Sequence, residues 1–117
     1  MSTTDQRRVD LEPGEIGIDL VSDEDGSPTL LLSGEIDAAT VGRLEACFLA
    51  VASAGATTVT VDFGDVGFVD SSGINALLVL RRTLGPTGRV QLRGCSPTMR
   101  RICGITGIGE VEGITVC

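Results

Sequence analysis

The sequence predicts a single α/β domain built on a mixed, mostly parallel β-sheet, with an N-terminal β-hairpin and helices packed against the sheet. Two observations predict this fold class. Two apolar strand-like segments near the N-terminus are joined by turn residues, and strand-like and helix-like segments then alternate to the end of the chain. A hairpin followed by strand–helix alternation gives the order β-β-α-β-α-β-α-β, in which the later strands are parallel.

The hairpin is expected within residues 16–36. Over residues 16–20, isoleucine and leucine alternate with glycine and aspartate, which indicates a strand with one buried face. Residues 23–28 have the composition of a turn, and a second strand follows over residues 29–36. Residues 1–14 show no periodicity, so we expect a flexible N-terminal tail and a folded domain over residues 15–117.

Helices and strands alternate in the rest of the chain. A helix is expected to begin at Asp37, whose carboxylate can cap the first turn, and to continue to Gly55. The β-branched run over residues 57–61, which ends at Asp62, is typical of a central strand covered on both faces, and a loop follows to Asp70. The later elements are expected to be a helix over residues 71–84, a strand over 89–95, a helix opening with Ser96 and Pro97, and a strand over 111–116.

The composition excludes several classes of function. The chain has no histidine, and all nine of its basic residues are arginine. Histidine-dependent nucleophiles and metal sites, Schiff bases and lysine-dependent phosphate loops are therefore impossible within this chain. The net charge of −7 and the lack of Trp and Tyr argue against nucleic-acid binding. No apolar run approaches the ~20 residues that span a bilayer, and the polar start is unlike a signal peptide, so we expect a cytoplasmic protein without a cofactor.

The four cysteines, at positions 47, 95, 103 and 117, do not have metal-ligand spacing. They are interpreted as reduced thiols packed as small apolar side chains, because cytosolic cysteines are reduced as a rule. A redox-sensitive pair among the last three is the alternative. No metal site is expected.

The most informative segment is residues 68–78, in which Asp70, Ser71, Ser72 and Gly73 stand at the expected start of the second helix. A carboxylate and two hydroxyls there lie among the unpaired amides of the first turn. Because Asp and Ser are ordinary capping residues, these residues alone leave two interpretations open: helix caps, or the centre of a modifiable contact surface.

Helical spacing separates this second helix into two faces. The side chains expected to pack on the sheet are those of Ile74, Leu77, Leu80 and Leu84. The side chains expected on the opposite, outward face are those of Ser72, Asn75, Val79 and Arg82. The second set suits a surface that contacts a partner.

Three short motifs precede the three helices in order: Gly34 to Asp37, Phe68 to Gly73, and Cys95 to Pro97. Together they resemble the STAS family of anti-sigma factor antagonists, over about residues 16–112. The resemblance implies the STAS fold and no enzymatic activity. Serine hydrolysis is further disfavoured by the lack of a base, and nucleotide binding by the glycine-rich run over residues 104–109 is disfavoured because that run does not follow a strand.

The resemblance also implies a partner-switching function. The unphosphorylated protein binds an anti-sigma factor, which is also a serine kinase, and so frees a sigma factor for transcription. The kinase phosphorylates the second serine of the motif, here Ser72, which abolishes binding, and a metal-dependent serine phosphatase restores the free form. Asp37 is implied to lie near the interface, and the free protein is expected to be a monomer.

A phosphate at this position would carry −1.5 to −2 charges at the positive end of a helix dipole, so the fold is expected to tolerate it or gain slightly. The partner would have to bury an unpaired anion, which is costly.

The sequence departs from the family pattern in two places. The family usually continues into a C-terminal helix, whereas this sequence stops at Cys117, and the basic residues are all arginine, so no lysine contacts carry over. The alternative function is that of a STAS interaction subunit in a transporter, lipid-trafficking or stress-signalling complex. The intact pair of serines favours the regulated switch.

Overall fold

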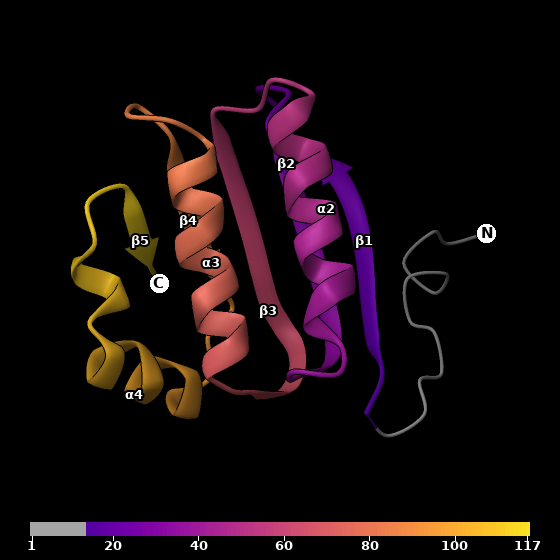
Figure 1. Cartoon of the computed structure of the whole chain (residues 1–117), viewed down its shortest axis with the longest axis vertical. Helices are drawn as coiled ribbons and strands as arrows, with labels where there is room; N and C mark the ends of the chain where they lie inside the picture. The colour runs from indigo at the N-terminus through magenta and orange to yellow at the C-terminus, as the bar shows by residue number, and fades with distance from the viewer. Residues whose placement is uncertain (1–13) are drawn as a thin grey trace.

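The computed structural model describes residues 14–117, so nearly all of the expected N-terminal tail lies outside the described residues. The element order agrees with the expected one (Figure 1). The elements are β1 (Ile16–Ser22), β2 (Pro28–Ile36), α2 (Val41–Ser53), β3 (Thr58–Val69), α3 (Ser71–Thr83), β4 (Arg89–Arg93), α4 (Pro97–Thr106), the 3-10 helix η1 (Ile108–Glu110) and β5 (Ile114–Val116).

The five strands form one sheet in the order β1-β2-β3-β4-β5. The hairpin strands β1 and β2 are antiparallel, and every later neighbouring pair is parallel. The expected mixed, mostly parallel sheet is therefore confirmed. Because each parallel strand is followed by a helix, the carboxyl ends of β2, β3 and β4 and the first turns of α2, α3 and α4 lie at the same end of the molecule, the lower end in Figure 1.

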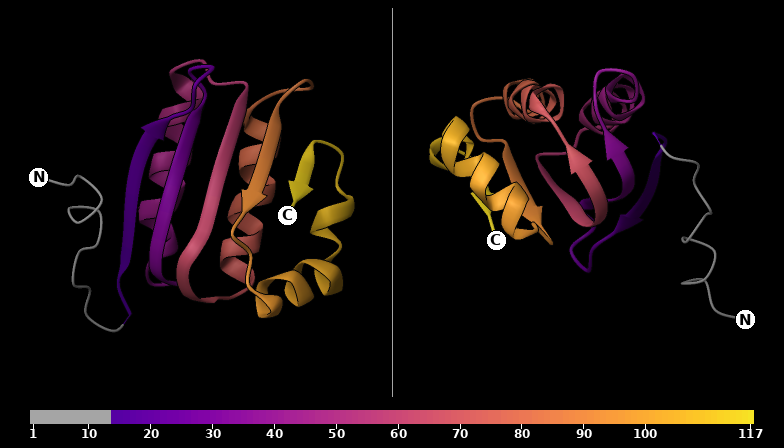
Figure 2. Two further views of the ribbon diagram at one scale, coloured as in Figure 1. Left: turned by 180° about the vertical axis from the view of Figure 1, so that it is seen from behind. Right: turned by 90° about the horizontal axis from the view of Figure 1, so that it is seen from below.

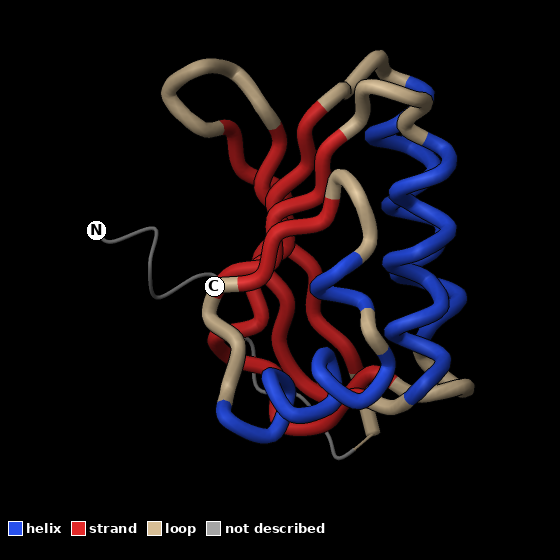
Figure 3. Tube along the Cα trace, turned by 90° about the vertical axis from the view of Figure 1, so that its left-hand side faces the viewer, coloured by secondary structure: helices blue, strands red, loops and turns tan. Residues whose placement is uncertain are grey.

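The two long helices α2 and α3 lie side by side on one face of the sheet (Figures 2 and 3). The core between these layers is apolar, and burial of such side chains is the main force that holds a domain of this size together. From the helices it contains Leu44, Phe48, Val51, Ile74, Leu77 and Leu80, and from the strands Leu30, Leu32, Val59, Val61, Phe63, Val90 and Leu92.

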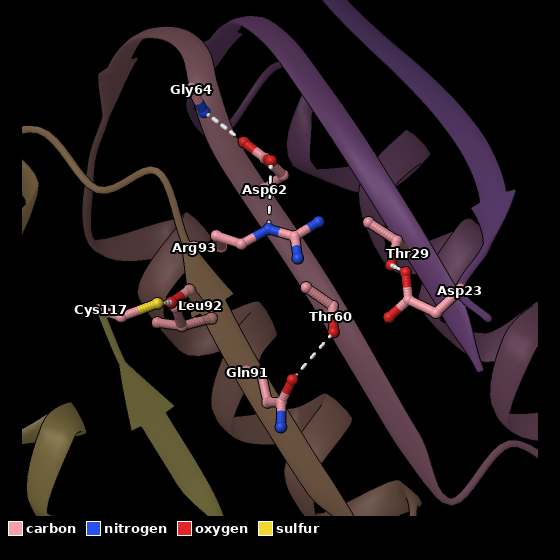
Figure 4. A network of polar contacts seen from close by, with 9 residues as sticks. All are labelled: Asp23, Thr29, Thr60, Asp62, Gly64, Gln91, Leu92, Arg93 and Cys117. Atoms are coloured by element: carbon pink, nitrogen blue, oxygen red, sulfur yellow. Dashed lines mark hydrogen bonds and ion pairs between the residues drawn. The ribbon is translucent and has the colours of Figure 1, made fainter. Parts of the chain in front are cut away.

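The expectation that the central strand is covered on both faces holds at residues 59–61, where successive side chains are all buried. The two faces are covered differently, because within residues 14–117 no helix lies on the face of the sheet that is turned away from α2 and α3 (Figure 3). Val59 and Val61 belong to the apolar core, whereas Thr60 lies on the face without helices and donates a hydrogen bond to the Gln91 side chain (3.2 Å; Figure 4). Threonine is β-branched and so resembles a buried apolar residue in the sequence, but its hydroxyl suits a face covered by polar neighbours.

Polar side chains cover one another across this open face. Thr29 is fully buried there, and its hydroxyl donates to the Asp23 carboxylate at 2.8 Å (Figure 4). Arg93 and Asp62 form an ion pair at 3.5 Å with half of the arginine side chain exposed, so it contributes at most about 1 kcal/mol.

Several boundaries differ from the expected ones. Strand β3 continues to Val69 because its second half pairs with the end of β2, where a loop was expected. Helix α2 begins at Val41, four residues after Asp37, and strand β4 ends at Arg93 instead of residue 95. Strand β5 is confined to Ile114–Val116, because residues 111–113 form a turn in which Gly113 has a positive φ.

Candidate functional site

The ends of β2 and β3 bring the first two motifs together. Ile36 and Val69 are paired in the parallel register, so Asp37 and Asp70 follow neighbouring strand ends. The Asp70 N–H donates to the Ile36 carbonyl at 3.1 Å, which extends the pairing by one residue. Two acidic residues far apart in the sequence are thus placed beside the first turns of α2 and α3.

Asp70 is the N-cap residue of α3, and the capping interpretation of the motif is confirmed. Its backbone is extended, and its carboxylate Oδ1 accepts the Ser72 N–H at 2.9 Å. The same oxygen accepts a hydrogen bond from the Ser72 hydroxyl. This hydroxyl lowers the pKa of Asp70 below its ordinary value, against a smaller opposing effect of desolvation. The carboxylate is therefore ionised at neutral pH and fixes the orientation of the Ser72 hydroxyl.

Ser71 and Gly73, the two neighbours of Ser72, have different surroundings. Ser71 is exposed, and Ser72 itself is half-buried. Gly73 is buried, and a Cβ atom there would lie 2.7 Å from Val69 Cγ2 and 2.9 Å from Ile36 Cγ2. Such distances are too short for carbon atoms, so the close approach of α3 to the ends of β2 and β3 requires glycine at this position.

The two expected faces of α3 are those of the structure. Ile74, Leu77 and Leu80 are buried, and Leu84, just after the helix, is half-buried. The outward residues Asn75, Val79 and Arg82 are exposed, along the same side of the helix as Ser72.

Asp37 does not cap α2 directly. Its carboxylate accepts the N–H groups of Ala39 and Thr40 at 2.9 and 3.1 Å, so it caps a turn that precedes the helix. Thr40 takes the N-cap position, and its hydroxyl donates to the Glu35 carbonyl at 2.9 Å. The physical reason is that the chain needs one extra turn to pass from the end of β2 to the helix layer. Asp37 remains half-buried at the same end as Ser72.

A groove between α2 and α3 was not predicted from the sequence. It has a volume of about 220 Å³ and is lined by Glu45, Phe48, Leu49, Ala76, Val79, Leu80 and Thr83. Leu49 is 60% exposed and Val79 is 39% exposed. The sequence did contain a signal for this groove. Leu49 follows the buried Phe48 and therefore lies about 100° round the helix from the buried side chains, so it is a large apolar residue outside the buried face.

The cysteines are all free thiols, but only Cys103 is buried. Cys47 and Cys95 are half-buried, and burial raises the pKa of Cys95 to about 11. Cys117 is exposed, and its thiol donates to the Leu92 carbonyl at 3.0 Å (Figure 4). The prediction that the cysteines pack as buried side chains is therefore correct for Cys103, partly correct for Cys47 and Cys95, and wrong for Cys117. Among residues 14–117, no His, Cys, Asp and Glu side chains are grouped so as to hold a metal ion.

The third motif forms a helix start as expected. The Ser96 hydroxyl accepts the Met99 N–H at 3.1 Å, and Pro97 is the first residue of α4. The missing N–H of a proline costs nothing at that position. In the described part of the chain, no helix has the length and apolar character needed to span a bilayer.

Comparisons with known proteins bear on the identity of this arrangement. Residues 20–115 match the family described as "Mlab, STAS domain". No curated protein matches the chain. An anti-sigma factor antagonist from Mycobacterium paratuberculosis is similar in structure, with 27% identity and a TM-score of 0.77 over 86% of this chain and 85% of that one.

Two structures of the anti-sigma factor antagonist SpoIIAA are also similar. The unphosphorylated form is 27% identical, with a TM-score of 0.68 over 86% of this chain and 87% of that one. The phosphorylated form, described as a Bacillus cell fate determinant, is 28% identical, with a TM-score of 0.67 over 86% of this chain and 91% of that one. The family match covers most of the sequence and agrees with the fold and with the three motifs. The chain belongs to the STAS domain family.

Proposed function

We propose that this protein is a cytoplasmic anti-sigma factor antagonist that is switched by phosphorylation of Ser72, and that it is not an enzyme. The observation that carries the proposal is the geometry of Ser72: its hydroxyl is held by Asp70 at the start of α3, on the same side as an exposed apolar residue. The similarity to antagonists solved with and without phosphate supports it.

The unphosphorylated protein binds an anti-sigma factor through this side of α3. The contact surface consists of Ser72, Asn75, Val79 and Arg82, with Asp37 nearby. Val79 is 39% exposed in the free protein, and covering it removes apolar surface from water. The bound anti-sigma factor releases its sigma factor, and transcription begins.

Phosphorylation reverses the binding. The anti-sigma factor acts as the kinase: the Ser72 Oγ forms a bond to the γ-phosphorus of ATP, the bond to the bridging oxygen breaks, ADP leaves with the electron pair, and the hydroxyl proton passes to solvent. The phosphate adds −1.5 to −2 charges to the contact surface. A metal-dependent serine phosphatase removes it again.

Affinity capture followed by phosphate mapping tests the proposal. The captured partner is purified, identified by mass spectrometry and incubated with ATP and either the wild type or Ser72→Ala. We expect an anti-sigma factor with kinase activity, phosphate on Ser72 of the wild type and none on the variant. Val79→Asp should weaken binding while the circular dichroism of the folded domain is kept. Phosphate found solely on another residue would refute the assignment of Ser72.

A second function is favoured by one observation, since the matching family is described by the name Mlab and not as a regulator of sigma factors. It is that of a STAS interaction subunit in a transporter, lipid-trafficking or stress-signalling complex. The capture experiment distinguishes the two functions. Recovery of a transporter subunit whose affinity is the same for the wild type and for the phosphorylated protein would establish the second.

A further inference from the structure

Two amide donors in the first turn of α3 are already in use. The Ser72 N–H donates to the Asp70 carboxylate at 2.9 Å, and the Gly73 N–H donates to the Asp70 carbonyl at 3.1 Å. Both are among the groups that an anion at a helix N-terminus normally receives. A single residue, Asp70, therefore occupies the place in which a phosphate on Ser72 would otherwise be stabilised.

Phosphorylation turns the attractive contact between Ser72 and Asp70 into a repulsive one. At present the serine hydroxyl donates its proton to the carboxylate. A phosphoryl group replaces that proton and puts a dianion beside a carboxylate that is ionised at neutral pH. The charged residues of neighbouring elements at this end include Glu35 and Asp37, at and just after the end of β2, and Arg43 of α2, whose guanidinium donates to the Ile16 carbonyl at 3.2 Å. The two carboxylates add negative charge at this end, and the arginine already has a partner.

We infer that Asp70 directs the phosphate of Ser72 away from the first turn of α3 and outward over the contact surface. The inference rests on the proposed function and adds to it the means by which the modification acts. A phosphate that capped the helix would be partly neutralised by the amides. A phosphate excluded by Asp70 keeps its charge beside Asn75 and Val79, where a partner must meet it. The earlier expectation that phosphate is tolerated or slightly stabilising at this helix start is revised accordingly.

A double replacement tests the inference without a kinase or a partner. Phosphoserine is placed at position 72 during synthesis of the full chain, once with Asp70 and once with Asp70→Asn. Asparagine caps helices as well as aspartate does, so both chains should fold. We expect the phosphate to lower the melting temperature of the Asp70 chain and to raise that of the Asn chain, each by at least about 2 °C.

Backbone amide signals in NMR spectra provide the second measurement. In the Asn chain, the N–H signals of Ser72 and Gly73 should move with the titration of the phosphate, near its second pKa of about 6. In the Asp70 chain these signals should move much less. Asp70→Ser, another capping residue, should behave like Asp70→Asn. Phosphoserine at position 71 is the matched control, and its effect on melting should be the same with Asp70 and with Asn.

Two results would overturn the inference. One is an equal change in melting temperature on phosphorylation in the Asp70 and Asn chains. The other is an amide titration shift in the Asp70 chain that is as large as the shift in the Asn chain. Because no kinase or partner enters these measurements, failure here is separate from failure of the proposed function, which is decided by capture and phosphate mapping.

Discussion

Replacing Gly73 with alanine adds one methyl group at the place where α3 packs most closely on the sheet. The new Cβ would lie 2.7 Å from Val69 Cγ2 and 2.9 Å from Ile36 Cγ2. Both contacts are with β-branched residues in the core, at 8% and 0% exposure, so neither side chain can rotate away easily. The start of α3 must therefore move away from the ends of β2 and β3.

The size of the effect follows from two opposing contributions. Overpacking a core by one methyl group costs about 1–3 kcal/mol. Alanine is better than glycine in a helix by about 1 kcal/mol. The expected net loss is therefore up to about 2 kcal/mol, and at about 4 °C per kcal/mol for a domain of this size the melting temperature falls by up to about 8 °C.

Thermal unfolding followed by circular dichroism measures this change, and Gly42→Ala is the matched control. Gly42 is in the first turn of α2, as Gly73 is in the first turn of α3, but nothing lies within 4 Å of its ideal Cβ position. Gly42→Ala should therefore raise the melting temperature, by up to about 4 °C. A rise in the melting temperature of Gly73→Ala as large as that of Gly42→Ala would refute the packing argument.

Three further predictions concern the site. Ser72→Asp should lower the melting temperature in thermal unfolding, because it loses the hydrogen bond to Asp70 and places two carboxylates side by side. Ser71→Asp, at the exposed neighbouring position, should leave the melting temperature unchanged or slightly higher. Leu49→Asp should weaken binding of the captured anti-sigma factor at least tenfold, about 1.4 kcal/mol by calorimetry. Ile105→Asp, on α4 at a still more exposed position, should not weaken it. The pKa of Asp70 is lowered in the folded state, so its contribution to stability is present above the pKa of the unfolded chain and is lost as the pH falls through the folded pKa. In urea unfolding between about pH 2 and 5, the free energy of unfolding should therefore fall less steeply with acid in Asp70→Asn than in the wild type. Identical pH dependence of the two proteins would contradict the role of that carboxylate.

Much of the fold was predictable because local patterns and tertiary structure agree. The alternation of apolar residues in the hairpin, the helical spacing in α3 and the Ser96–Pro97 start of α4 each report a local preference that the folded chain keeps. The capping segment at the start of α3 was also accessible, because a carboxylate followed by two hydroxyls at a helix start is a property of the linear chain. Its interpretation as a switch depended on three motifs in order.

Other features could not be read from the chain. The second half of β3 contains glycine and aspartate and looks like a loop, yet it is a strand because β2 offers it hydrogen-bonding partners. The open face of the sheet was missed because threonine has the same β-branched shape as valine. The groove beside Leu49 exists only because α2 and α3 pack side by side.

The sequence by itself determined which residues stand at the start of α3 and which of its faces is apolar, since these depend on spacing within one helix. The capping bonds of Asp70 are local, since they reach residues two to four positions away. Only the tertiary structure decided where that helix start lies: the Asp70 N–H pairs with the Ile36 carbonyl, and Gly73 lets the helix approach two strand ends. The physical reason is that packing distances and hydrogen-bond partners are set by segments far apart in the chain, and no local pattern contains them.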